Sequence, residues 1–180
     1  MKGVYRTRVG YAGGTLENPT YQRLGDHSET IQIDFDPAVI TYAEILEFFW
    51  SWHNPAAIQW SRQYMSAIFY HDQLQHKVIT ERIARVEQEF GSQVNTEILP
   101  LTVFYLAEDY HQKYFLQNEQ ELAHEIKRYY PGFKDFVDST AAARLNGIIG
   151  GYADPDLLEK ELDMYGLSPL GLEILKRYTK

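Results

Sequence analysis

Residues 29–36 read Glu-Thr-Ile-Gln-Ile-Asp-Phe-Asp. Apolar and polar side chains alternate through this stretch, which predicts a half-buried β-strand with Ile31, Ile33 and Phe35 on its apolar face. The strand should end at Pro37, because proline cannot donate a ladder hydrogen bond. One buried face on one strand requires a sheet around it and helices to cover it.

A helix is predicted directly after this strand. Thr41 and Glu44 have the spacing of a capping box, in which each side chain bonds the other residue's backbone N–H. His53-Asn-Pro should stop the helix. Its apolar face is expected to consist of Ile45, Phe48, Phe49 and Trp52.

The rest of the chain divides into a mixed part and a helical part. Strands are predicted at 66–70 and 96–106, the latter interrupted by Pro100, with a long helix between them after Asp72. The glycine runs at 10–14 and 147–151 are interpreted as turns. Short helices are predicted at 121–130, 139–146, 155–165 and 169–178, with Asp154 and Ser168 as N-caps before prolines. We therefore expect an α+β sandwich over residues 1–118 and a helical extension over 119–180.

Composition excludes several classes of function. The 180 residues carry a net charge of -8, which disfavours nucleic acid as a partner, and 14% aromatic residues argue against disorder. No long apolar run or secretory signal is present, so we expect a cytoplasmic protein with no membrane contact. The six histidines form no ligand pair at helical spacing, so no metal or cofactor is predicted. There is no cysteine, which rules out a thiol nucleophile within these residues.

Several motifs occur together in one order, and each alone would be weak. They are Val-Gly-Tyr-Ala-Gly-Gly at 9–14, Asn-Pro-Thr-Tyr at 18–21, His-Ser-Glu at 27–29, His-Asn-Pro at 53–55, Gln-Tyr-Met-Ser-Ala-Ile-Phe-Tyr at 63–70 and Ala-Glu-Asp-Tyr-His-Gln-Lys-Tyr at 107–114. In this order and spacing the chain closely resembles the peptide methionine sulfoxide reductase A family over residues 3–117.

The resemblance implies a fold, a reaction and a set of residues. The fold would be a two-layer sandwich of a mixed sheet with packed helices. The reaction would be reduction of methionine S-sulfoxide, free or in proteins, at the expense of thiols, with thioredoxin or another external thiol as reductant. By motif, Glu29 would protonate the sulfoxide oxygen while the hydroxyls of Tyr21 and Tyr64 bind it. Glu29 would need apolar, aromatic surroundings to stay protonated near neutral pH.

The chain departs from the family pattern where the thiol should be. The family's Gly-Cys-Phe-Trp nucleophile motif and its first strand are absent, and we expect both upstream of Met1. No aspartate precedes Tyr64 in residues 54–63, where the family carries one. Two alternatives remain open: a non-catalytic protein that binds methyl sulfoxides, and a truncated remnant. As written, the 180-residue chain is predicted to be inactive unless an upstream cysteine is restored.

Overall fold

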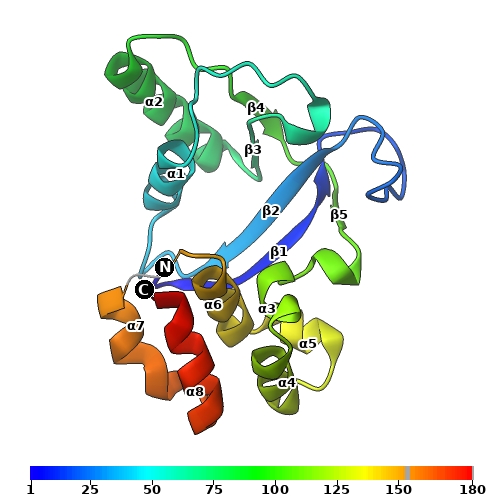
Figure 1. The fold of residues 1–180 in the computed structure, drawn as a ribbon. Helices are drawn as coiled ribbons and strands as arrows, with labels where there is room; N and C mark the ends of the chain where they lie inside the picture. The colour runs from blue at the N-terminus through cyan, green and yellow to red at the C-terminus, as the bar shows by residue number, and fades with distance from the viewer. Residues whose placement is uncertain (153–154, 180) are drawn as a thin grey trace.

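The computed structural model describes residues 1–152 and 155–179 and has an α+β fold, as predicted. One antiparallel sheet has the order β2–β1–β5, and a separate pair of parallel strands consists of β3 and β4. Figure 1 shows the long β1–β2 hairpin across the middle of the molecule, with α1, α2, β3 and β4 on one side and the later helices on the other. The strands are β1 (Val4–Ala12), β2 (Ser28–Phe35), β3 (Ala67–Tyr70), β4 (Glu97–Pro100) and β5 (Phe104–Leu106).

The helices fall into the same two groups. The helices beside β3 and β4 are α1 (Tyr42–Ser51) and α2 (Gln73–Phe90). The later helices are α3 (Tyr114–Asn118), α4 (Gln120–Tyr129), α5 (Phe133–Asp138), α6 (Thr140–Ile149), α7 (Pro155–Glu161) and α8 (Pro169–Leu175). Short 3-10 turns complete the described chain: η1 (Arg62–Tyr64), η2 (Asp109–His111), η3 (Leu162–Tyr165) and η4 (Lys176–Thr179).

The interpretation of residues 10–14 as a turn was wrong for its first half. Gly10 lies inside β1, where a side chain would collide with the Tyr105 backbone oxygen at 2.3 Å and with the ring of Phe104. Glycine is needed there because β5 approaches β1 closely, and not because the chain bends. The turn begins only at Gly13, whose φ is +81°.

The strand predicted at 96–106 is two strands in two different sheets. β4 ends at Pro100 and pairs with β3, while β5 begins at Phe104 and pairs with β1. The backbone N–H groups of Glu97 and Leu101 donate to the oxygens of Ser66 and Tyr70 at 2.9 Å each, so the pairing with β3 does not need an N–H at Pro100. Residues 101–103 therefore connect the two groups of strands.

The capping box of α1 is confirmed, whereas its predicted apolar face is only partly buried. The Glu44 N–H donates to Thr41 Oγ1 at 3.2 Å, and the Thr41 N–H donates to the Glu44 carboxylate at 2.8 Å. Phe48 and Trp52 are exposed, although the ring of Trp52 contacts that of Tyr152 at 4.8 Å. The buried residues of α1 are Ile45, Leu46 and Trp50.

The predicted long helix and short helices are present, but α6 continues to Ile149, so the interpretation of residues 147–151 as a turn was wrong for residues 147–149. Asp72 caps α2, and Ser168 caps α8 ahead of Pro169, as the sequence indicated. α3 and α5 were not predicted because each is under two turns long. The predicted cap at Asp154 lies outside the described residues. The helices α3 to α8 share one hydrophobic core, and this core includes Leu116, which precedes the predicted domain boundary at residue 118. The division of the chain at that residue therefore stays a prediction.

A cluster of charges attaches the later helices to β1. The Arg8 guanidinium donates from Nε to Asp138 at the end of α5 at 2.7 Å, and Lys134 donates to the same carboxylate at 2.6 Å. Burial raises the pKa of Asp138, but the hydrogen bonds from Arg8 and Lys134 outweigh it and hold this pKa at about 2. The Asp138 side chain is only 12% exposed, so this ion pair contributes more than a surface pair would.

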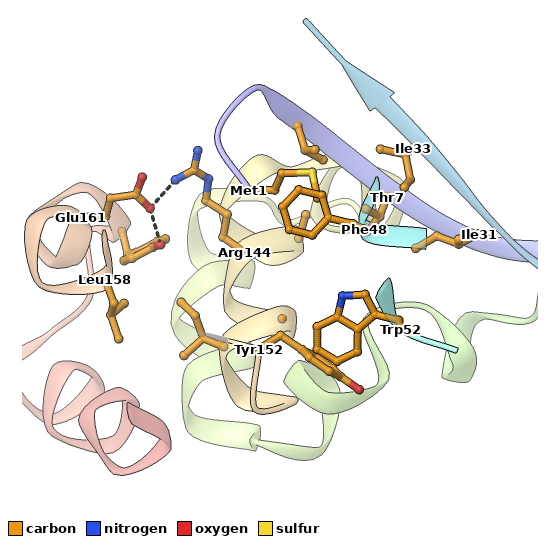
Figure 2. Close-up of a pocket in the computed structure, with 15 residues that line it drawn as sticks. Met1, Thr7, Ile31, Ile33, Phe48, Trp52, Arg144, Tyr152, Leu158 and Glu161 are labelled. Carbon is orange, nitrogen blue, oxygen red and sulfur yellow. Dashed lines mark hydrogen bonds and ion pairs between the residues drawn. The ribbon is translucent and has the colours of Figure 1, made fainter. Parts of the chain in front are cut away.

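The predicted apolar face of β2 borders open space instead of a core. Ile31 is 56% exposed, and a cavity of about 500 Å³ separates this strand from α1 and from α6, α7 and η3. Figure 2 shows Phe48 and Trp52 facing this cavity, with the Arg144–Glu161 ion pair at its opposite side. The expectation of a half-buried strand was therefore wrong for Ile31.

A second groove, of about 400 Å³, runs between β2 and β3. Every residue of β2 lines it, as do residues 67–69 of β3. β2 is hydrogen-bonded only to β1, and β3 only to β4, so each strand has an unpaired edge among the described residues. The single mixed sheet that the resemblance implied is thus divided in two along this groove. Among the described helices, none is long and apolar enough to cross a bilayer.

We predict that Asp138→Asn lowers the free energy of unfolding by about 2 kcal/mol at pH 7, because it removes charge-assisted hydrogen bonds from Arg8 and Lys134. The folded-state pKa of Asp138 is depressed, so its stabilisation is complete above the ordinary value of 3.8 and is lost as pH falls towards about 2. Urea unfolding of both proteins at pH 7 and pH 3 should show the difference shrinking. Asp163→Asn, at an exposed site, is the control. A difference that grows on acidification would contradict the assignment.

Candidate active site

Glu29 stands at the start of β2, next to the short turn η1. Gln63 Nε2 donates to Glu29 Oε1 at 2.6 Å, and Ser28 Oγ donates to the backbone oxygen of Arg62 at 2.6 Å. These bonds hold η1 against the beginning of β2. Because Gln63 occupies one carboxyl oxygen, the other oxygen is left to carry a proton or to meet a ligand.

Tyr64, at the end of η1, lies close enough to Tyr21 and Glu29 to interact with both electrostatically. Burial, followed by a hydrogen bond with Tyr21 and by the negative charge of Glu29, raises the pKa of Tyr64. The structure therefore brings together all of the sequence-predicted residues, Glu29, Tyr21 and Tyr64. The side chains of Tyr21 and Tyr64 remain 42% and 46% exposed.

Glu108 places Tyr21, which lies in a loop between β1 and β2. Its carboxylate accepts from the Tyr21 backbone N–H at 3.0 Å and from the Tyr11 hydroxyl at 2.6 Å. The Tyr11 hydrogen bond lowers the pKa of Glu108, which stays ionised and strengthens both contacts. His111 packs its ring against that of Tyr21 at 4.8 Å.

The loop that carries Tyr21 is closed on itself by two side chains. Asp26 accepts from the Thr15 backbone N–H at 2.8 Å and from the Thr15 hydroxyl, and these bonds hold the pKa of Asp26 at about 2. His27 is buried, accepts from the Gly14 N–H at 3.1 Å and contacts the Leu16 oxygen at 2.8 Å. These partners place the ring proton of His27 on Nε2.

Arg62 joins the two halves of the site. Its guanidinium donates to the backbone oxygens of Asp26 and Gly13 at 3.3 and 3.4 Å, and forms an ion pair with Glu97 of β4 at 2.9 Å. A planar fork of donors suits this bridge between three segments. Residue patterns alone assigned no role to Arg62, and the structure supplies one.

One expectation about the site needs correction. Glu29 was expected in apolar, aromatic surroundings, but its side chain is exposed, because the groove between β2 and β3 opens beside it. The segment before Tyr64 carries no aspartate, as the sequence shows. There Gln63 donates to Glu29, a contact that only the folded proximity of residues 34 apart reveals.

The site carries two tyrosine hydroxyls and a carboxyl group, and a hydroxyl or a protonated carboxyl group donates a hydrogen bond. Such donors suit a neutral oxygen with a large partial charge, such as that of a sulfoxide or an amide. Among residues 1–152 and 155–179, no group of three or more His, Asp or Glu side chains could hold a metal ion.

Comparison with known proteins identifies the family. The family model described as peptide methionine sulfoxide reductase matches residues 1–144. The peptide methionine sulfoxide reductase of Drosophila melanogaster is 39% identical over 170 residues, which cover 93% of this chain and 68% of that protein. The chain belongs to the peptide methionine sulfoxide reductase family.

Other members of the family are similar in sequence or structure. Peptide methionine sulfoxide reductase MsrA of Pasteurella multocida is 40% identical over 129 residues, which cover 67% of this chain and 74% of that protein. A crystal structure of Mxr1 from Saccharomyces cerevisiae in reduced form matches with a TM-score of 0.59 and 30% identity, over 63% of this chain and 71% of that one. Methionine sulfoxide reductase A of Corynebacterium diphtheriae matches with a TM-score of 0.55 and 30% identity, over 65% of each chain. The α+β fold is thus the fold of this reductase family.

We predict that Glu108→Gln loosens the Tyr21 loop, since a neutral amide cannot accept two charge-assisted hydrogen bonds. The Tyr21 amide should exchange its hydrogen about tenfold faster, which NMR exchange measurements detect. Asp109→Asn, at the exposed neighbouring carboxylate, should leave this rate unchanged. Equal exchange rates in the Glu108→Gln protein and the unaltered protein would show that Glu108 does not hold the loop.

Proposed function

We propose that this chain is a peptide-methionine (S)-S-oxide reductase in which Glu29, Tyr21 and Tyr64 act on the sulfoxide oxygen. A thiolate attacks the sulfur, the S–O bond breaks, and the oxygen passes to the thiol as a sulfenic acid. Glu29 supplies a proton to the oxygen during this step, and the tyrosine hydroxyls donate hydrogen bonds to it. The methionine is reduced, and the thiol is oxidised.

One observation supports this proposal: three side chains from separate segments lie near one another. Tyr21 comes from the loop after β1, Glu29 from β2 and Tyr64 from η1. Donors without a fixed positive charge suit the oxygen of a neutral sulfoxide better than a phosphate or carboxylate, which Arg and Lys usually bind. Family membership over residues 1–144 supports the same reaction.

The thiol must come from outside the 180 residues, which contain no cysteine. An additional strand between β2 and β3 could carry it, since both strands present unpaired edges to the groove there. Met65 and Glu29 line the groove, so a strand that fills it would reach the acid. Filling the groove would also shield Glu29 from water, which favours its protonated form.

Turnover requires a second reductant. A sulfenic acid formed in the first step is reduced by another thiol, which yields a disulfide and water. Thioredoxin or another external thiol would serve, and the substrate would be methionine S-sulfoxide, free or in oxidatively damaged proteins. Without an added cysteine, the 180-residue chain would bind the sulfoxide and not reduce it. A non-catalytic sulfoxide-binding protein is the second candidate, favoured by the absence of cysteine.

We predict that the 180-residue chain binds blocked methionine S-sulfoxide, and that Tyr21→Phe, Tyr64→Phe and Glu29→Ala each weaken binding about fivefold to tenfold. Each change removes one hydrogen bond to the oxygen, worth about 1 kcal/mol. NMR titration with N-acetyl-methionine-S-sulfoxide methylamide measures these dissociation constants, and the amide signals of the three residues should shift.

Two controls make this titration decisive. Tyr5→Phe removes the hydroxyl of another exposed tyrosine, at the far end of β1, and should leave binding unchanged. The R epimer should bind more weakly than the S epimer, because its oxygen points differently when the methyl group is fixed. Undiminished binding by the Tyr21→Phe protein would contradict the assignment of the site.

A further inference from the structure

The side chain of Gln112 takes the place of a strand residue beside β1. β5 pairs with β1 only at Gly10 to Ala12, and the Gln112 amide pairs with the next residue of β1 in both directions. The Val9 backbone N–H donates to Gln112 Oε1 at 3.1 Å, and Gln112 Nε2 donates to the Val9 oxygen at 2.8 Å. Two residues of antiparallel strands exchange the same two bonds. A side chain therefore continues the ladder where β5 ends.

The same amide ties β1 to the residue after β5. Gln112 Nε2 also donates to the Ala107 oxygen at 3.1 Å, while the Ala107 N–H donates to the Val9 oxygen at 3.1 Å. The Gln112 residue is only 3% exposed, so these bonds lie away from solvent, where the loss of a hydrogen-bond partner costs most. Ala107 directly precedes Glu108. Gln112 thus fixes the backbone that carries Glu108 relative to β1.

Glu108 transmits this placement to the candidate site. Its carboxylate accepts from the Tyr11 hydroxyl at 2.6 Å and from the Tyr21 backbone N–H at 3.0 Å. Tyr11 lies on β1, two residues beyond Val9. Because the Gln112 amide sets the spacing between β1 and the segment that carries Glu108, both hydrogen bonds of Glu108 depend on it. A change in that spacing would move Tyr21.

The turn that carries Gln112 is itself held firmly. Gln117 Nε2 donates to the Gln112 oxygen at 2.6 Å and to the Asp109 oxygen at 2.7 Å. Lys113 has a φ of +51°, and its buried ammonium donates to the Thr7 oxygen on β1. Such a backbone conformation persists in a residue other than glycine only where its surroundings fix it. The Gln112 amide is therefore presented to β1 by a constrained segment.

We infer that Gln112 is a positioning residue for the reaction, which places Tyr21 through Glu108, and this inference rests on the proposed function. Donors that are held in place before the ligand arrives need no ordering when it binds. Only an amide side chain carries a donor and an acceptor side by side, as a peptide group does. Loss of this amide should therefore weaken oxygen binding without removing any group that contacts the oxygen.

Hydrogen exchange measured by NMR, without any ligand, tests the placement of Tyr21. Gln112→Met keeps the side-chain length, and the Tyr21 amide should exchange about tenfold faster relative to the amides of α2. Gln112→Glu at pH 5 should exchange within about twofold of the unaltered chain, because a buried carboxyl group that faces backbone oxygens stays protonated and offers the same donor and acceptor. Gln120→Met, at the exposed first residue of α4, is the matched control and should change nothing.

Binding of the blocked S-sulfoxide distinguishes positioning from a general loss of stability. Gln112→Met should raise the dissociation constant about threefold in the otherwise unaltered chain. In a chain that already carries Tyr21→Phe, the same change should have no further effect, because the hydroxyl that Gln112 places is already gone. Should Gln112→Met fail to fold, Gln112→Asn, whose amide is one methylene group short, takes its place with the same expectations.

The outcomes separate this inference from the proposed function. If the unaltered chain does not bind the blocked sulfoxide, the proposed function fails, and the exchange rates alone decide whether Gln112 places Tyr21. An unchanged Tyr21 exchange rate in Gln112→Met overturns the inference, and so does an equal loss of binding with and without Tyr21→Phe. A Gln112→Glu chain that exchanges as fast as Gln112→Met at pH 5 also overturns it, since the paired donor and acceptor would then make no difference.

Discussion

The hydrogen bonds around Arg62 hold together two groups of strands that share no backbone ladder. On one side they contact the turn at Gly13 and the loop at Asp26, and on the other they reach Glu97 of β4. Ser28 and Glu29 add contacts from β2 to the same short turn. Tyr64 meets Tyr21 and Glu29 only because this junction exists.

The contacts around Arg62 give the candidate site two sides with different chemistry. One side presents hydroxyl and carboxyl groups that are already positioned, since Glu108 and Gln63 fix Tyr21 and Glu29. The other side is the groove between β2 and β3, with unpaired edges along both strands in the described part of the chain. An unpaired strand edge presents backbone N–H and C=O groups with which another strand can pair. Oxygen binding is thus built into these residues, whereas the sulfur chemistry depends on what fills the groove.

The sequence predicted those features whose causes are local. The capping box of α1 and the N-caps of α2 and α8 depend on residues within one turn, and all are present. Gly10 was misread because its reason lies in β5, which is distant along the chain. Ile31 was expected to be buried because alternation tells which residues share a face, but not whether another element covers that face.

The site residues could be named only through family resemblance. Neither periodicity nor spacing indicates that Gln63 meets Glu29, or that Glu108 holds the backbone of Tyr21. These contacts join segments that are far apart along the chain, and their geometry is set by tertiary packing.

The most direct test is thiol-dependent reduction of methionine S-sulfoxide by this chain after an N-terminal strand carrying Gly-Cys-Phe-Trp is added. With dithiothreitol as reductant, the extended chain should reduce the S epimer and leave the R epimer unchanged. Glu29→Gln in the extended chain should lower the rate about 100-fold or more, as expected for loss of a general acid. The 180-residue chain should give no product above background. Turnover by the 180-residue chain itself, or an undiminished rate with Glu29→Gln, would contradict the account.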